Sequence, residues 1–156
     1  MLIILSITVA LAAPSMRGWG QGQKLKNATD EFIAATGNAR ARAVATAMPF
    51  AVEIKVSDNT FAVKSIEAGG TRKAVPGEFG QDTKLPTDFT IKLATGGAAA
   101  AAVPDPGVAA GESVILFYPD ARCTPAAVEI TSPNGDVARI ESLSPAEPFR
   151  KVETAP

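Results

Sequence analysis

The chain begins with an uncharged apolar stretch that runs from residue 2 to residue 13 and ends at Pro14. As an α-helix this stretch would rise about 18 Å, at about 1.5 Å per residue, whereas the hydrocarbon core of a bilayer is about 30 Å thick. It is therefore too short to cross a membrane by itself. Two interpretations are open: the apolar region of a cleavable signal peptide, or the later part of a longer helix whose first turns precede Met1. The residues predicted to form this membrane or assembly helix are Leu2, Ile3, Ile4, Leu5, Ile7, Val9, Leu11 and Pro14.

A helical period follows between residues 24 and 47. Apolar residues recur there at alternating steps of three and four, which places them on one stripe of a helix. The stripe, which we expect to pack on a sheet, consists of Leu25, Ala28, Phe32, Ala35 and Ala39. Met48-Pro49 ends the helix, because proline cannot continue it. Upstream, three alternating glycines within 15–23 each lower helix propensity by about 1 kcal/mol relative to alanine, which predicts a flexible neck.

Beyond Pro49 the hydrophobic period becomes two residues, which is typical of β-strands. Residues 50–56 and 60–66 alternate around the turn formers Ser57-Asp58-Asn59 and so predict a hairpin. Further strands are expected at 89–93, 114–118, 127–131, 137–140 and 149–152. Two segments rich in glycine, proline or alanine, 69–86 and 95–111, are expected to be long exposed loops.

One helix followed only by strands indicates an α+β protein, in which an amphipathic helix packs on an antiparallel sheet. We expect residues 1–23 to form the apolar helix and the neck. Residues 24–156 are expected to form one globular domain, with a helix at about 24–47 and β-structure from 50 to 152. A chain of 156 residues, 46% of them hydrophobic, is long enough for a domain of this kind.

The composition argues against catalysis. The chain has no histidine, which is the commonest general base and a frequent metal ligand. We therefore expect that the protein is not an enzyme and that it has no cofactor and no metal site. Cys123 is the only cysteine and is expected to be a small buried residue. The 15 basic and 16 acidic residues nearly cancel, so the overall charge does not indicate a nucleic-acid-binding protein.

The order of these parts resembles that of type IV pilin-like proteins: an apolar helix ending at a proline, a neck, a helix rich in alanine and arginine, and a β-rich tail. More narrowly, residues 25–28 and the Asn-Ala-Arg-Ala-Arg-Ala-Val-Ala-Thr sequence at 38–46 are similar to the helix of minor pseudopilins of the GspH/FimT family. Residues 115–122 look like that family's strand and turn, in which an aromatic residue precedes Pro-Asp-Gly. Ala121 stands here at the glycine position.

The resemblance implies a structural subunit of the type II secretion pseudopilus. Such a protein is held in the inner membrane by a single helix, is processed by a prepilin peptidase and methylated, and carries its globular domain in the periplasm. Its partners are other pseudopilins and secretion-system subunits. When Pro14 is set on the family's span-terminal proline, Met1 falls about eight residues inside the mature helix, and adding those residues gives about 30 Å of helix. We therefore expect the leader peptide and the first mature residues to lie upstream of Met1.

Two other functions fit parts of the sequence. One is a secreted or periplasmic β-rich binding module, because Ala10-Leu11-Ala12 supplies a signal-peptidase pattern, although no basic residue precedes the apolar stretch. The other is a FimT-like minor pilin of a type IV pilus that contacts DNA through basic residues of the β-rich tail. The candidate residues for that contact are Arg122, Arg139, Arg150 and Lys151. Arg40 and Arg42, near the end of the predicted helix, are expected to be solvated charges.

Overall fold

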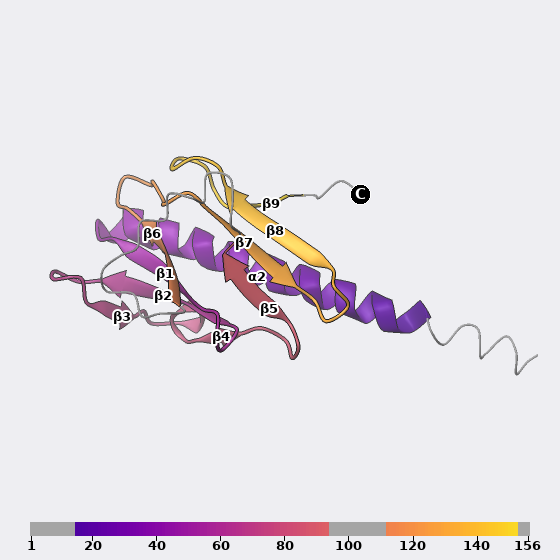
Figure 1. The fold of residues 1–156 in the computed structure, drawn as a ribbon. Coiled ribbons are helices and arrows are strands. Elements are labelled where there is room, and N and C mark those ends of the chain that lie inside the picture. Colours follow the sequence, from indigo (N-terminus) through magenta and orange to yellow (C-terminus); the bar gives the residue numbers. More distant parts are fainter. Residues whose placement is uncertain (1–14, 94–111, 153–156) are drawn as a thin grey trace, which may run out of the picture.

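The computed structural model describes residues 15–93 and 112–152 (Figure 1). The eight residues predicted for the apolar assembly helix and the loop predicted at 95–111 lie outside this part of the chain. The described residues form one long helix, α2, followed by the strands β1 to β9 and a short 3₁₀ helix, η1, between β3 and β4.

The helix α2 spans Ser15–Thr46 and is 32 residues long. It includes residues 15–23, which were predicted to form a flexible neck and which are helical in the structure. Helix formation is cooperative, and once a packed segment exists each added residue gains a backbone hydrogen bond, which outweighs the low propensity of the glycines. A Cβ atom at Gly20 or Gly22 would meet no atom within 4 Å, so close packing does not require either glycine.

The first sheet contains the predicted hairpin at its centre. Its strands are β1 (Phe50–Lys55), β2 (Thr60–Ile66), β3 (Arg72–Ala74), β4 (Thr83–Lys84) and β6 (Glu112–Phe117). The order is β3-β2-β1-β6, β4 also pairs with β2, and every pairing is antiparallel. In the hairpin Val52 lies opposite Val63, and Ile54 lies opposite Phe61. These core-facing residues share one face because side chains alternate along a strand.

The second sheet consists of the later strands. They are β5 (Thr90–Leu93), β7 (Ala126–Thr131), β8 (Val137–Ser142) and β9 (Arg150–Val152), in the order β5-β7-β8-β9 and all antiparallel. The predicted α+β class, with a helix on antiparallel β-structure, is confirmed. The described strands form two sheets rather than the single sheet expected, because a period of two does not tell which strands pair.

The prediction of an exposed loop at 69–86 is wrong in part. The segment contains β3, η1 (Glu78–Gly80) and β4, and it buries Val75 and Leu85 in the core. Strands of two or three residues are too short to show an alternating period. The glycines and prolines of this segment are then the strongest local signal, and they predict a loop. At Gly80 an added Cβ would lie 1.7 Å from the Val75 carbonyl oxygen, so the chain packs here only without a side chain.

The core lies between α2 and the two sheets. The ring of Phe32 on α2 meets that of Phe61 on β2 edge-on, with the centroids 5.2 Å apart. The rings of Phe117 on β6 and Phe149, which precedes β9, lie 6.1 Å apart and thereby join the two sheets. Cys123 is 2% exposed, as predicted for a small buried residue.

Candidate assembly surface

The helix α2 has a projecting part and a packed part along its length. Its N-terminal end extends beyond the strands (Figure 1). From Gly20 to Asn27 every residue is exposed or half-buried, and the first buried residue is Ala28. Among the described residues, no helix is both long enough and apolar enough to span a membrane.

The packed part of α2 turns one stripe of residues toward the sheets. Of the five residues predicted for this stripe, Ala28, Phe32, Ala35 and Ala39 are at most 2% exposed, and Leu25 packs against the same core from a half-buried position. Ala43 extends the stripe by one further turn. The steps of three and four residues keep these side chains on one face, and the small alanines let the helix lie close to the strands.

Arg40 and Arg42 flank the buried stripe and fasten α2 to loops on its two sides. Arg40 Nη2 donates a hydrogen bond to the Ala146 carbonyl oxygen at 2.6 Å, in the loop between β8 and β9. Arg42 Nη2 donates to the Pro76 carbonyl oxygen at 3.0 Å, between β3 and η1, and its Nε donates to Asn38 at 2.8 Å. The expectation that both arginines are only solvated charges is therefore wrong. Their spacing of two residues was the available signal, since it places them on different flanks of a helix.

The solvent-facing side of α2 changes in character halfway along the helix. In the first part it carries polar residues such as Lys24, Lys26 and Asp30. From residue 34 to residue 45, the exposed residues are only small or apolar, namely Ala34, Gly37, Ala41, Val44 and Ala45. We call these five residues the outer α2 face. A helix that buries one side in its own domain normally presents polar residues to water on the other, so this face has the character of a contact surface.

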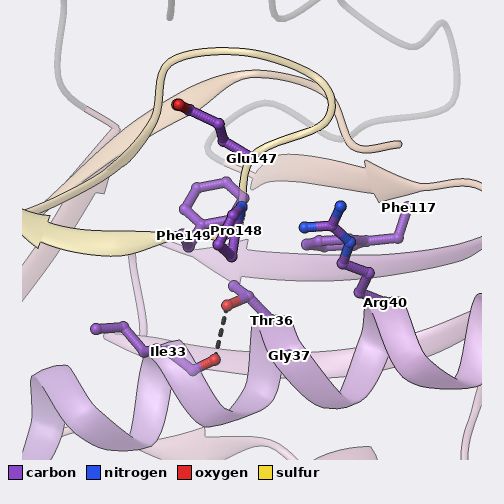
Figure 2. Close-up of a pocket in the computed structure, with 8 residues that line it drawn as sticks. All are labelled: Ile33, Thr36, Gly37, Arg40, Phe117, Glu147, Pro148 and Phe149. Atoms are coloured by element: carbon purple, nitrogen blue, oxygen red, sulfur yellow. Dashed lines mark hydrogen bonds between the residues drawn. The ribbon is translucent and has the colours of Figure 1, made fainter. Parts of the chain in front are cut away.

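A small slot opens at the edge of the outer α2 face, between α2 and the loop that joins β8 to β9. Its volume is about 80 Å³, and we call it the Gly37 slot. Pro148 and Phe149 face Ile33 and Thr36 across it, whereas the Glu147 side chain points away from α2 (Figure 2). The residues that line the slot are Ile33, Thr36, Gly37, Arg40, Phe117, Glu147, Pro148 and Phe149.

Two carboxylates lie near each other where α2 passes η1. Partial burial raises the pKa of the Glu31 carboxyl above its ordinary value of 4.5, and the negative charge of Glu78 raises it further. The fold therefore favours the neutral form of Glu31. The described residues contain no group of three or more side chains that could hold a metal ion, so this pair is not part of such a cluster.

The turn that the sequence likened to Pro-Asp-Gly is closed by hydrogen bonds. Tyr118 N donates to the Arg122 carbonyl oxygen at 2.8 Å, and Ala121 N donates to the Tyr118 carbonyl oxygen at 3.0 Å. Ala121 has a φ of 65°, in the left-handed region that glycine occupies most easily. The alanine thus adopts a glycine-like conformation at the glycine position.

The basic residues predicted for DNA contact are partly neutralised. Arg139 pairs with Glu141 at 3.1 Å and with Glu129 at 3.5 Å, and Arg122 pairs with Asp120 at 3.3 Å. Arg150 and Lys151 are exposed on the short edge strand β9, where Arg150 lies opposite Glu141. Each of the three arginines thus has a carboxylate beside it, which weakens the positive potential that a DNA contact needs.

The comparisons with known proteins find a likeness in structure. No family model matches the sequence, and no curated protein matches it either. Two structures of the minor pseudopilin EpsH from the type 2 secretion system of Vibrio cholerae match at 14% identity, with TM-scores of 0.63 and 0.64. They cover 83% and 86% of this chain and 96% of each solved EpsH chain. The type IV minor pilin FimU of Pseudomonas aeruginosa matches with a TM-score of 0.60 and 14% identity, over 86% of this chain and 92% of FimU.

At 14% identity these similarities concern the fold. They extend over nearly the full length of the matched chains. The protein therefore has the pilin-like α+β fold of GspH/FimT-like minor pseudopilins and minor pilins.

Proposed function

We propose that the protein is a minor pseudopilin, a structural subunit of the type II secretion pseudopilus without enzymatic activity. The observation that carries this proposal is the outer α2 face. Its exposed residues from Ala34 to Ala45 carry no charge and are small enough to let another helix or subunit approach closely. Assembly with other pseudopilins would cover this face, whereas a free head domain would leave it in water.

The apolar stretch before α2 supplies the second part of the proposal. Residues 2–13 precede α2 in the chain and carry no charge. In the proposed function they form the later part of a single membrane helix that holds the protein in the inner membrane and packs in the filament core after assembly. The globular domain then lies in the periplasm.

The fold likeness supports a subunit of this general kind. EpsH is a minor pseudopilin of a type 2 secretion system, and FimU is a type IV minor pilin. Both are named as components of pilin-type systems rather than as enzymes. The likeness covers 96% of the solved EpsH chain, so it extends over that whole structure and not over one part of it.

A charge placed on the outer α2 face tests the proposal. Ala41→Glu keeps a good helix former at an exposed position, so we expect the head to fold with unchanged stability. In the native host, incorporation into the sheared pseudopilus fraction should fall about tenfold or more, because assembly would bury an unpaired carboxylate. Thr87→Glu, at an exposed turn between β4 and β5, is the matched control and should be incorporated normally. Equal incorporation of both variants would contradict the proposal.

A type IV pilus is the second candidate, since FimU supports it as much as EpsH supports secretion. The neighbouring genes separate the two, because a secretion ATPase favours the pseudopilus and a retraction ATPase favours the pilus. N-terminal sequencing of the mature protein separates both from a secreted module. Signal peptidase would leave a chain that starts near Ala13 or Pro14, without the apolar helix.

A further inference from the structure

Large apolar side chains are exposed together at one end of the molecule. Among the described residues six such side chains are exposed, and four of them belong to segments at this end. The four are Val44 and Met48 at the end of α2, Tyr118 in the β6-β7 turn and Leu143 in the β8-β9 loop, each between 39% and 50% exposed. We call these four residues the distal patch. The other two, Val56 and Val137, lie at the opposite ends of β1 and β8.

The segments that carry the distal patch are fixed to one another. Cys123 N, in the β6-β7 turn, donates to the Pro145 carbonyl oxygen at 2.8 Å, in the β8-β9 loop. Phe117, which precedes Tyr118, pairs with Phe50 at the start of β1, just after α2 ends. The end of α2, the turn and the loop also lie at the same end of the molecule in Figure 1. The patch is therefore one preformed surface, and an exposed apolar surface of this kind marks a contact site.

Charge does not dominate this surface. The end of α2 from Val44 onward, the β6-β7 turn and the β8-β9 loop contain two acidic residues and one basic residue. Asp120 and Arg122 pair with each other at 3.3 Å. Arg40 and Glu147, which both line the Gly37 slot beside the outer α2 face, have opposite charges. A partner for this end is thus recognised by apolar contact and not by a net charge.

The distal patch is continuous with the outer α2 face, because Val44 belongs to both. The combined surface follows the C-terminal half of α2 and then passes over the end of the molecule (Figure 1). The small residues of the first part allow a second helix to lie close to α2. The larger side chains of the second part suit a globular surface. The whole surface therefore fits a helix that continues into a head, placed beside this chain and displaced along α2.

The apolar stretch before α2 sets the direction of that displacement. Residues 2–13 precede α2, so in the proposed function the distal patch lies at the far end of a 32-residue helix, about 48 Å from its membrane end. Subunits held in one membrane have parallel helices, so their distal patches face the same way and cannot meet. The neighbour must therefore cover the patch with the membrane-facing end of its own head.

A second copy of this chain does not fit that place. Below its head the helix carries the exposed residues Lys24 and Lys26, which would lie against the uncharged outer α2 face. The β1-β2 turn at that end of the head exposes Ser57 and Asp58, which would meet the apolar patch. Burying such groups without partners is costly. The neighbour is therefore a chain of different sequence, as expected for a minor subunit.

We propose that the outer α2 face and the distal patch together receive one pilin-like subunit of different sequence. Its helix would lie on the outer α2 face with uncharged positions, and the membrane-facing end of its head would cover the distal patch with apolar side chains. This inference rests on the proposed function, because it names the kind of partner that covers the assembly surface and the side on which that partner lies.

Photo-crosslinking from the distal patch tests this placement. The full chain with Tyr118→p-benzoylphenylalanine, expressed in the native host and irradiated in intact cells, should form a covalent adduct. Mass spectrometry should identify the second chain of the adduct as a pilin-like subunit of different sequence. Val56→p-benzoylphenylalanine, at an exposed position of the opposite end, is the matched control and should not form this adduct.

A charge in the distal patch tests the contact itself. Leu143→Asp should reduce the adduct formed from position 118 about tenfold or more, because docking would bury an unpaired carboxylate. Met48→Asp, on the α2 side of the patch, should act in the same way. Val137→Asp is the matched control, since Val137 is 48% exposed and Leu143 is 49% exposed, and it should leave the adduct unchanged. Thermal unfolding of the three variants should match that of the wild type.

Several results would overturn the inference. They are an adduct with a second copy of this chain or with a secreted protein, the absence of any adduct, an equal adduct from position 56, and an adduct that neither aspartate in the patch reduces. In each of these cases, normal incorporation of the wild-type chain and exclusion of Ala41→Glu would leave the proposed function standing. Equal incorporation of Ala41→Glu and Thr87→Glu would instead remove the proposed function itself.

Discussion

Two alanines occupy backbone conformations that glycine adopts more easily. Ala121 has a φ of 65° in the turn after β6, and Ala47 has a φ of 54° directly after α2 ends. We expect Ala121→Gly and Ala47→Gly each to raise the free energy of unfolding by about 0.5–1 kcal/mol, because glycine relieves the steric cost of a left-handed residue. Urea denaturation followed by circular dichroism measures the change.

Ala34→Gly is the control for this prediction. Ala34 lies within α2 and is exposed, so glycine should lower stability there by about 1 kcal/mol. A loss of stability at all three positions would show that positive φ is not the decisive property.

Gly80 presents the opposite case. An added Cβ would lie 1.7 Å from the Val75 carbonyl oxygen, so Gly80→Ala requires the backbone of the 75–80 segment to move. We expect a loss of about 2–4 kcal/mol, in the range of severe steric changes in a core. Thermal unfolding measures it, and Gly37→Ala, which adds a Cβ in open space, should be neutral or stabilising.

At the scale of elements, the two arginines should act on separate segments. Arg40→Met keeps an aliphatic stem but loses the bond to Ala146, so hydrogen exchange should accelerate in the β8-β9 loop. Arg42→Met should accelerate exchange around Pro76 instead. Each loss should cost about 1 kcal/mol, the usual net value of a hydrogen bond. Faster exchange in both segments in either variant would mean that the arginines hold the fold as a whole.

The elements also show which parts of the fold the sequence can predict. The buried stripe of α2 and the longer strands follow from local periods of 3.6 and two, and these appear where predicted within the described chain. β3 and β4 have only three and two residues and leave no period to read.

The candidate assembly surface is harder to predict because it depends on distant pairings. The bonds of Arg40 and Arg42 reach residues 106 and 34 positions away in the chain. The Gly37 slot exists only because the β8-β9 loop folds back onto α2. The uncharged exposed positions of α2, by contrast, can be read from the sequence once the buried stripe is fixed.

At the scale of the whole molecule, Glu31 should give stability a dependence on pH. Its pKa in the fold is raised above the ordinary value of 4.5, so its neutral form is favoured by folding. The stabilisation from this group is complete below the ordinary pKa and is lost as pH rises through the raised one. Glu31→Gln should therefore be more stable than the wild type at pH 7, by about 0.5 kcal/mol or less for a group this exposed, and equal to it at pH 3.

Chemical denaturation at the two pH values checks this expectation. Because the charge of Glu78 helps to raise the pKa of Glu31, the gain in stability from Glu31→Gln at pH 7 should be smaller in a Glu78→Gln background. A gain of the same size at pH 3 would attribute the effect to something other than ionisation.

The attachment of α2 to both sheets has a mechanical consequence. A force applied at the projecting end of the helix acts along its axis, parallel to the whole length of its contact with the strands. Phe32, Ala39 and the two arginine bonds would then carry the load together in shear, instead of separating one after another as in peeling. The two sheets held in this way resist separation from α2 when the helix is under tension along its axis.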